Sequence, residues 1–321
     1  GTIETLGELS HAISVSGGEN KTTVSGSIVT GDPNENTKTK NSYGIRNEGI
    51  GNETTVSAGG SIKTYGTSSH GIYNLGDGNE TTVSAGGTVT TTGPSSHGVF
   101  NEGNTNTTTI SAGTLDGNNI TTSGADAHGI YNSGKSNETT IDAVGSIATT
   151  GIGASGIANS GNSNKTDVAG SITTQGETAY GIYNFGDSNT TTVSGSIITG
   201  SDVTTSSKHG IYNLGDNNIT ILAPGGSITT TGVNTGGIFQ AGDNNTAGVF
   251  GTVNSSGTGS AALNNASGTG NTFVLNETAV IIGSISASNA ASNNTLALSE
   301  HADFELTVGG SPNEGEVGQG T

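Results

Sequence analysis

Histidine is the residue whose spacing in this sequence most suggests chemistry. Four of the six histidines head copies of one recurring segment, and tyrosine heads two more: His70, His97, His128, His209, Tyr43 and Tyr180. A row of imidazoles could ligate metal ions or transfer protons. No carboxylate recurs at a fixed short offset from these residues, however, and Ser155, Gly236 and Ala261 take their place in other copies. We therefore expect a column of packed or hydrogen-bonded side chains.

Aspartates in the turns are a second candidate, since aligned carboxylates and backbone carbonyl groups could hold Ca²⁺. They are Asp77, Asp187, Asp216 and Asp243. Other copies carry no acid at this position: Ile50, Asn104, Lys135 and Asn162. The Gly-Gly-x-Gly-x-Asp calcium repeat is also missing, and Asp and Asn are ordinary turn formers. We expect no cofactor and no metal, with Ca²⁺ at the Asp-containing turns as the alternative.

Asn-x-Thr sequons also occupy a fixed place in the repeat. They begin at Asn20, Asn52, Asn79, Asn106, Asn137, Asn164 and Asn189. In a chain so rich in Asn and Thr, a fixed place indicates a structural role at the start of a strand before it indicates glycosylation.

A catalytic centre would need convergent titratable groups in a cleft. Arg46 is the only arginine, the lysines are scattered, and no carboxylate pair stands out from the turn pattern. The absence of Cys excludes disulfides, thiolate metal sites and cysteine catalysis. We predict that the chain is not an enzyme, and a β-helical carbohydrate-active enzyme is the weakest alternative.

Composition narrows the class of protein that carries these residues. Glycine fills 56 of 321 positions, while only 11% of residues are charged and 29% hydrophobic, which argues against a conventional globular core. The 4 prolines and the steady supply of Val, Ile and Thr argue against disorder. A net charge of −18 repels nucleic acid and anionic membranes. We expect no signal peptide in residues 1–10 and no direct membrane insertion, because no apolar run approaches 18 residues.

An internal repeat of about 27 residues supplies the architecture. Each copy contains three short Thr/Val/Ile-rich stretches separated by Gly, Asn and Asp, which indicates three strands. About three buried aliphatic side chains per copy, at roughly 1.5–3 kcal/mol each, cannot offset the ordering of about 27 residues at roughly 1–2 kcal/mol each. The copies must therefore stack. We predict an all-β, right-handed, three-faced parallel β-solenoid of about ten coils and roughly 50 Å.

Four segments follow from the strength of the repeat. Residues 1–10 are a lead-in, residues 11–264 are regular coils, residues 265–310 are degenerate coils and residues 311–321 are a flexible acidic tail. Two copies are longer than the rest, which predicts surface loops at residues 114–118 and 201–207.

The first strand of each copy shows which side chains point inward. Its third residue is aliphatic throughout: Ile45, Ile72, Val99, Ile130, Ile157, Ile182, Ile211, Ile238 and Leu263. Alternation assigns the first and fifth residues to the same inward face. The fifth residue is asparagine in the first seven of these copies, at Asn47, Asn74, Asn101, Asn132, Asn159, Asn184 and Asn213. Stacked amides can hydrogen-bond along the axis, so we predict a structural Asn ladder.

The fourth residue of that strand should face outward. After Arg46 it is aromatic in six of seven copies, interrupted by Ala158: Tyr73, Phe100, Tyr131, Tyr183, Tyr212 and Phe239. Aromatic side chains stacked in this way can stabilise a sheet by covering it. An exposed aromatic file also marks partner or glycan sites, so we name these six residues the contact stripe.

The pattern Ser/His-Gly-Ile-Tyr-Asn-x-Gly, followed by Thr-Thr-Val-Ser-x-Gly-Ser-Ile-x-Thr, covers residues 11–310. It resembles the passenger regions of bacterial autotransporters and related large exported β-helical adhesins. The resemblance implies secretion to the Gram-negative cell surface and a role in adhesion, aggregation or surface coating. It carries over no catalytic residues, because no serine-protease motif occurs in the chain.

We therefore predict a non-enzymatic, extracellular β-solenoid at the bacterial cell surface. Its expected partners are further copies of itself, or a protein or glycan of a host or cell surface, and not nucleic acid. The alternative is a structural subunit that polymerises into an extracellular filament or surface layer, since open solenoid ends can continue by edge pairing.

Overall fold

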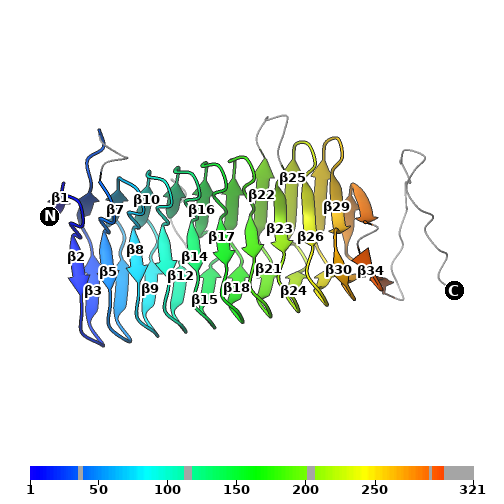
Figure 1. The fold of residues 1–321 in the computed structure, drawn as a ribbon, viewed down its shortest axis with the longest axis horizontal. Coiled ribbons are helices and arrows are strands. Elements are labelled where there is room, and N and C mark those ends of the chain that lie inside the picture. The colour runs from blue at the N-terminus through cyan, green and yellow to red at the C-terminus, as the bar shows by residue number, and fades with distance from the viewer. Residues whose placement is uncertain (35–38, 112–117, 201–206, 289–290, 300–321) are drawn as a thin grey trace.

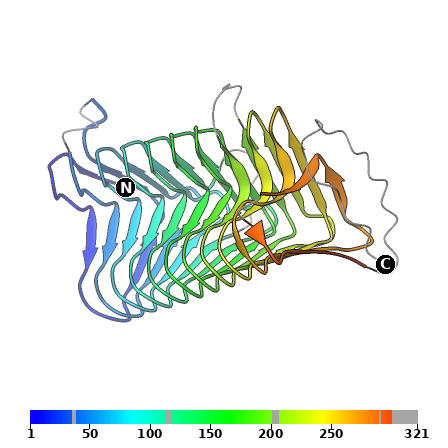
Figure 2. The same ribbon diagram turned by 45° about the vertical axis from the view of Figure 1, so that its right-hand side comes forward.

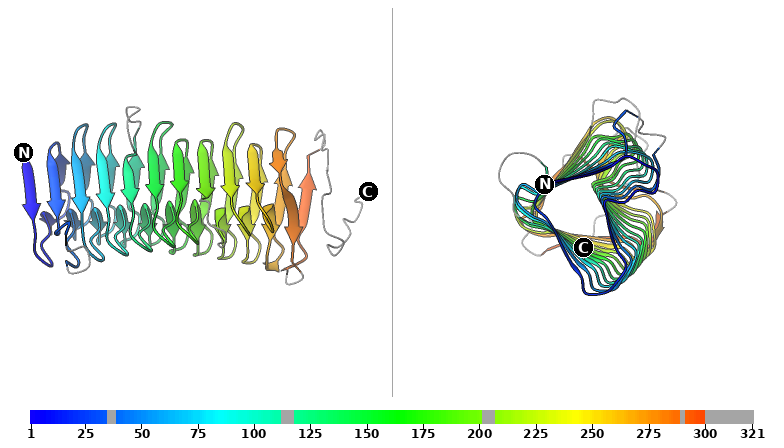
Figure 3. Two further views of the ribbon diagram at one scale, coloured as in Figure 1. Left: turned by 90° about the horizontal axis from the view of Figure 1, so that it is seen from above. Right: turned by 90° about the vertical axis from the view of Figure 1, so that its left-hand side faces the viewer.

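The computed structural model describes residues 1–34, 39–111, 118–200, 207–288 and 291–299. Within these residues the chain forms a rod of stacked coils, with strands and turns and no helix (Figure 1). Each coil contributes one strand to each of three parallel sheets, which run side by side along the rod (Figure 2). Seen from the end, the coils superimpose on a three-sided outline (Figure 3). The predicted three-faced parallel β-solenoid is confirmed.

The three sheets each contain eleven strands among the described residues. Sheet A consists of β1 (Thr2–Thr5), β4 (Ser27–Thr30), β7 (Ser61–Thr64), β10 (Thr88–Thr91), β13 (Ile120–Thr122), β16 (Ser146–Thr149), β19 (Ser171–Thr174), β22 (Ser196–Gly200), β25 (Ser227–Thr231), β28 (Thr252–Ser256) and β32 (Val280–Ile282). Sheet B consists of β2 (Ile13–Val15), β5 (Ile45–Asn47), β8 (Ile72–Asn74), β11 (Val99–Asn101), β14 (Ile130–Asn132), β17 (Ile157–Asn159), β20 (Ile182–Asn184), β23 (His209–Asn213), β26 (Gly236–Gln240), β29 (Ala261–Asn265) and β33 (Ser284–Ala287).

Sheet C completes the coil. It consists of β3 (Lys21–Val24), β6 (Glu53–Val56), β9 (Glu80–Val83), β12 (Thr107–Ile110), β15 (Glu138–Ile141), β18 (Lys165–Val168), β21 (Thr190–Val193), β24 (Ile219–Leu222), β27 (Thr246–Val249), β31 (Thr272–Leu275) and β35 (Thr295–Leu298). A small two-stranded sheet, β30 (Gly268–Thr269) with β34 (Ala291–Ser292), lies near the C-terminal end of the described chain.

Equivalent residues of successive coils pair in register, so each repeated position becomes a column. In sheet B, for example, Ile72 pairs with Val99 and Val99 pairs with Ile130. Aliphatic columns from all three sheets meet along the axis, and Ile130 and its equivalents in neighbouring coils are fully buried. The aliphatic spacing of the sequence thus produces one continuous core that no single coil could form.

Because equivalent residues of successive coils pair in register, one whole coil can be deleted without breaking the columns. Deleting residues 70–96 removes one whole coil and places His97 where His70 stood, so every column stays continuous. We expect a folded β-rod, with an unchanged circular dichroism shape and a maximum dimension in small-angle scattering shorter by about 4.8 Å. Deleting residues 70–82 instead removes half a coil and puts strands of different sheets opposite one another. That variant should fail to fold, and equal behaviour of the two deletions would contradict the stacking.

Candidate functional site

The Asn ladder occupies the inner side of sheet B. Each Nδ2 donates to the Oδ1 of the next coil at 2.8 Å, from Asn47 through to Asn213. The second Nδ2 hydrogen is donated to the hydroxyl of a threonine seven residues on, at 3.0–3.2 Å. All seven asparagines are fully buried. Because the amides satisfy one another, these residues hold the coils together and present no free donor to a ligand.

A second asparagine column, which the sequence showed only as sequons, lies where sheet C begins. The Oδ1 of each residue accepts the backbone N–H of its equivalent in the preceding coil, as Asn79 does from Asn52 at 2.8 Å and Asn106 from Asn79 at 2.7 Å. The sequon asparagines after Asn20 are buried. Asn79, Asn164 and Asn189 also donate from Nδ2 to a glycine carbonyl oxygen. Glycosylation needs that nitrogen to be accessible, so the burial of these side chains favours the structural role of the sequons.

The turn aspartates act as backbone acceptors. Asp216 Oδ1 accepts the N–H of Asp243 at 2.7 Å, and Asp187 Oδ1 accepts that of Asp216 at 2.9 Å. Asp77 and Asp243 make the same contact with the next coil. Among the described residues, no group of three or more His, Asp or Glu side chains is placed to hold a metal ion. Binding of Ca²⁺ at these turns stays a prediction.

The contact stripe lies on the outer side of sheet B, where its side chains are partly buried. Near-parallel rings follow one another at 5.1 Å from Tyr73 to Phe100 and at 5.1 Å from Phe100 to Tyr131. Tyr183 and Tyr212 are 5.4 Å apart, and the Phe239 ring then meets Tyr212 edge-on at 4.9 Å. These are favourable aromatic geometries. The stripe is therefore both a cover for the sheet and a surface of ring edges and hydroxyl groups.

The histidine column lies beside the stripe and not in the core, so the inward orientation predicted for the first residue of each segment is wrong. His70 contacts Tyr73 and Phe100 at ring-centroid distances of 5.5 and 5.0 Å. The inward position belongs instead to the following glycine: a Cβ on Gly71 would come within 2.3 Å of Val89 Cγ1. Strand β8 starts only at Ile72, so strand alternation does not extend back to His70.

The imidazoles stack face to face. His70 and His97 lie 4.9 Å apart with an interplanar angle of 4°, and His97 and His128 lie 5.1 Å apart at 3°. Each Nδ1 accepts the backbone N–H of the residue heading the next coil: His70 from His97, His97 from His128, and His128 from Ser155, all at 3.0 Å. An Nδ1 that accepts must be unprotonated, so the contact holds these rings neutral with the proton on Nε2.

Burial reinforces this preference for the neutral ring. It lowers the pKa of His70 to about 3 and that of His128 to about 4. Burial and the neighbouring imidazoles together hold the pKa of His97 well below its usual value. Burial also lowers the pKa of His209, further along the rod, to about 3. Groups that stay neutral across the physiological range are poor general acids and bases.

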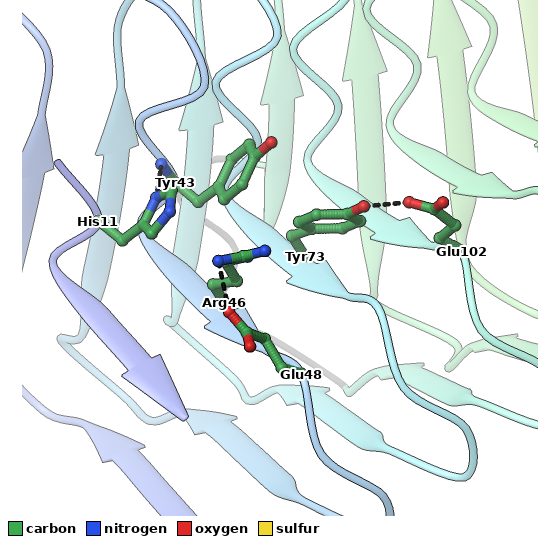
Figure 4. Close-up of polar contacts among 6 residues, drawn as sticks. All are labelled: His11, Tyr43, Arg46, Glu48, Tyr73 and Glu102. Atoms are coloured by element: carbon green, nitrogen blue, oxygen red, sulfur yellow. Dashed lines mark hydrogen bonds and ion pairs between the residues drawn. The ribbon is translucent and has the colours of Figure 1, made fainter. Parts of the chain in front are cut away.

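The N-terminal end of the stripe is polar (Figure 4). Arg46 pairs with Glu48, and the Tyr73 hydroxyl donates to Glu102. Tyr43 stacks on His11 with ring centroids 4.6 Å apart. Charged groups thus border the stripe at this end.

The stripe is interrupted in one coil. Ser155 stands in the histidine column and Ala158 in the aromatic column, so one coil lacks both rings. A cavity of about 260 Å³ opens there, and it is lined by His128, Tyr131, Ala158, Asn159, Ser160, Tyr183 and Phe185. The two substitutions were visible in the sequence, but only the structure shows that the gap in both columns leaves a cavity.

No protein-family model matches the chain, and no curated protein matches its sequence. Two solved structures of the tailspike protein of E. coli bacteriophage HK620 in complex with pentasaccharide, one of them a double mutant, match at 13% and 14% identity with a TM-score of 0.32. The match covers 94% of this chain and 59% of the tailspike chain, so this chain spans less than two thirds of that protein. The resemblance to autotransporter passengers is not confirmed by these matches.

None of the described segments is a helix long and apolar enough to cross a membrane. The loops expected at residues 114–118 and 201–207 lie mostly outside the described residues, and the tail expected at residues 311–321 lies wholly outside them.

Proposed function

We propose that the chain is a non-enzymatic extracellular β-solenoid that attaches to a surface partner through the contact stripe. The observation that carries this proposal is the stacked file of aromatic side chains on the outer side of sheet B. Aromatic residues supply large contact area at low cost in side-chain entropy, and they dominate binding surfaces.

The rest of the coil supports a binding role over a catalytic one. The Asn ladder, the sequon asparagines and the turn aspartates are engaged in hydrogen bonds between coils. The stacked histidines are held neutral by the same kind of contact. These columns build the rod, and the stripe is the column whose hydroxyl and ring edges face outward.

The alternative is a subunit that polymerises. Ile3, Leu6 and Leu9 are 43%, 56% and 68% exposed in and beside β1. Exposed apolar side chains at a strand can bind another copy.

The stripe can be tested by removing its rings. Replacing Tyr131, Tyr183 and Tyr212 by Ser should leave the β-sheet spectrum unchanged but abolish adhesion of the chain, coupled to beads, to cells or glycan-coated surfaces. The matched control replaces the same three residues by Phe, which the chain already carries at Phe100 and Phe239, and should retain more adhesion than the Ser variant because it keeps the rings.

Adhesion of the Ser variant at the parental level would exclude the stripe as the contact surface. The polymerising alternative would be favoured if the unmodified chain formed regular fibres in electron microscopy and both variants still adhered.

A further inference from the structure

The interrupted coil of the stripe forms a slot between two stacks of rings. His128 and Tyr131 end the N-terminal stack, while Tyr180 and Tyr183 begin the C-terminal one. Elsewhere in the stripe, the ring centroids of adjacent coils are 4.9–5.4 Å apart. Two coil spacings place the walls of the slot about 10 Å apart, which is the room that one further ring would take.

The contacts around the slot show that a ring is missing there. His128 is partly exposed, whereas His70, His97 and His209 are buried, because Ser155 does not cover it as an imidazole would. Ala158 forms the floor and is 3% exposed, so the flanking side chains overhang it. Phe185, at the mouth of the slot, is 53% exposed, and its ring centroid lies 5.9 Å from that of Tyr183.

Polar groups stand at fixed places around these ring faces. Ser160 donates to the Tyr131 hydroxyl at 3.1 Å on one side. Burial raises the pKa of Tyr183 to about 12, so its hydroxyl remains a neutral donor and acceptor on the other side. His128 accepts the Ser155 N–H at Nδ1, so its ring is neutral with the proton on Nε2.

We propose that this slot binds one neutral pyranose ring of a glycan. The faces of a pyranose carry C–H groups that pack on aromatic rings, and its edge carries hydroxyls that match the Tyr131, Ser160 and Tyr183 hydroxyls. A volume of about 260 Å³ suits a single ring, being below the range typical of larger ligands. The net charge of −18 disfavours anionic sugars.

An aromatic side chain of a protein partner would match the walls but would use none of the lining hydroxyl groups, so the sugar fits more of the site. This inference rests on the proposed function, since the slot lies within the contact stripe, and it specifies the ligand class of one position in it.

The test fills the slot. Ala158→Phe supplies the missing ring of the stripe, while Ala148→Phe, a partly buried outward position of β16 in sheet A, is the matched control. Binding of methyl glycosides of neutral hexoses is measured by saturation-transfer NMR and by the fluorescence of the tyrosines. We expect millimolar affinity in the parent and in Ala148→Phe, and at least a tenfold loss in Ala158→Phe, with both variants folded by circular dichroism.

Three outcomes would overturn the proposal: no binding of any neutral hexoside to the parent, equal binding by Ala158→Phe, or binding of phenol and indole without binding of the hexosides. Sialic acid should bind more weakly than the neutral sugars. The test is independent of the adhesion assay. Hexoside binding by a chain whose Tyr→Ser variant still adheres would refute the stripe as the adhesive surface and leave the slot standing. If the Ser variant lost adhesion but the parent bound no hexoside, the stripe would stand as the adhesive surface and the slot would be refuted as a sugar site.

Discussion

Ile130→Asp is expected to destabilise the rod by more than 4 kcal/mol. Ile130 is fully buried in β14, between Val99 and Ile157 of the adjacent coils. Truncating a buried isoleucine costs about 2–5 kcal/mol, and the substitution adds an unpaired carboxylate to an apolar core. Because the aliphatic columns are continuous, the damage affects the contacts of three coils at once. Urea denaturation followed by circular dichroism measures the loss as a lower midpoint.

Thr140→Asp is the matched control for this charge. Thr140 is a partly buried, outward residue of β15, and it pairs with Asp167 of the next coil, so the chain already carries an aspartate in that column. We expect a change within about 0.5 kcal/mol apart from repulsion between the two carboxylates. Equal effects of the two substitutions would mean that the assignment of inner and outer faces is wrong.

Acidification is the second change with a large expected effect. An unfolded histidine has a pKa near 6.5, whereas the folded pKa is about 3 for His70 and about 4 for His128. The unfolded state therefore binds more protons between these values. Stability is fully present above pH 6.5 and is lost as the pH falls towards the folded pKa values. At pH 5 each of His70, His128 and His209 removes about 2 kcal/mol, or about 6 kcal/mol together, and His97 adds a loss in the same direction.

This loss has a structural signature. Protonation of Nδ1 turns an acceptor into a donor and breaks the contact with the backbone N–H of the next coil. Urea midpoints measured between pH 7 and pH 5.5 isolate the histidines, because carboxyl groups titrate at lower pH.

A variant with His70→Tyr, His97→Tyr and His128→Tyr is the control, since Tyr43 and Tyr180 occupy the same column naturally. It should be less stable at pH 7, but across this interval it should lose far less stability than the parent, with a residual loss from His209, whose folded pKa is also about 3. A parent whose stability does not change between pH 7 and pH 5.5 would contradict the assignment of neutral, hydrogen-bonded imidazoles.

The fold could be predicted from the sequence because the same pattern of aliphatic residues recurs in every copy of the repeat. The aliphatic third residue, exemplified by Ile130, lies in the core, and the spacing of about 27 residues matches one coil. Such a pattern predicts stacking since no coil can bury its apolar side chains alone.

The orientation of His70 could not be obtained from alternation, because the strand is only three residues long and begins after the glycine. The recurring glycine at that position was a signal for the close approach to Val89. The slot was harder still to predict. Ser155 and Ala158 were each visible as exceptions, but whether neighbouring rings close over a missing one depends on packing that sequence does not show.

The in-register columns have a consequence for how the chain reaches its native state. Each coil presents nearly the same aliphatic, amide and aromatic surface, so a coil can dock on its second neighbour almost as well as on its first. The coil between would then be extruded as a loop, and closing a longer loop adds only about 0.6 kcal/mol for each doubling of its length. Such shortened stacks are kinetic traps with native-like sheets. Coils of unequal length and the coil with Ser155 and Ala158 make some of these mispairings imperfect, which gives an otherwise degenerate chain internal landmarks along its folding route.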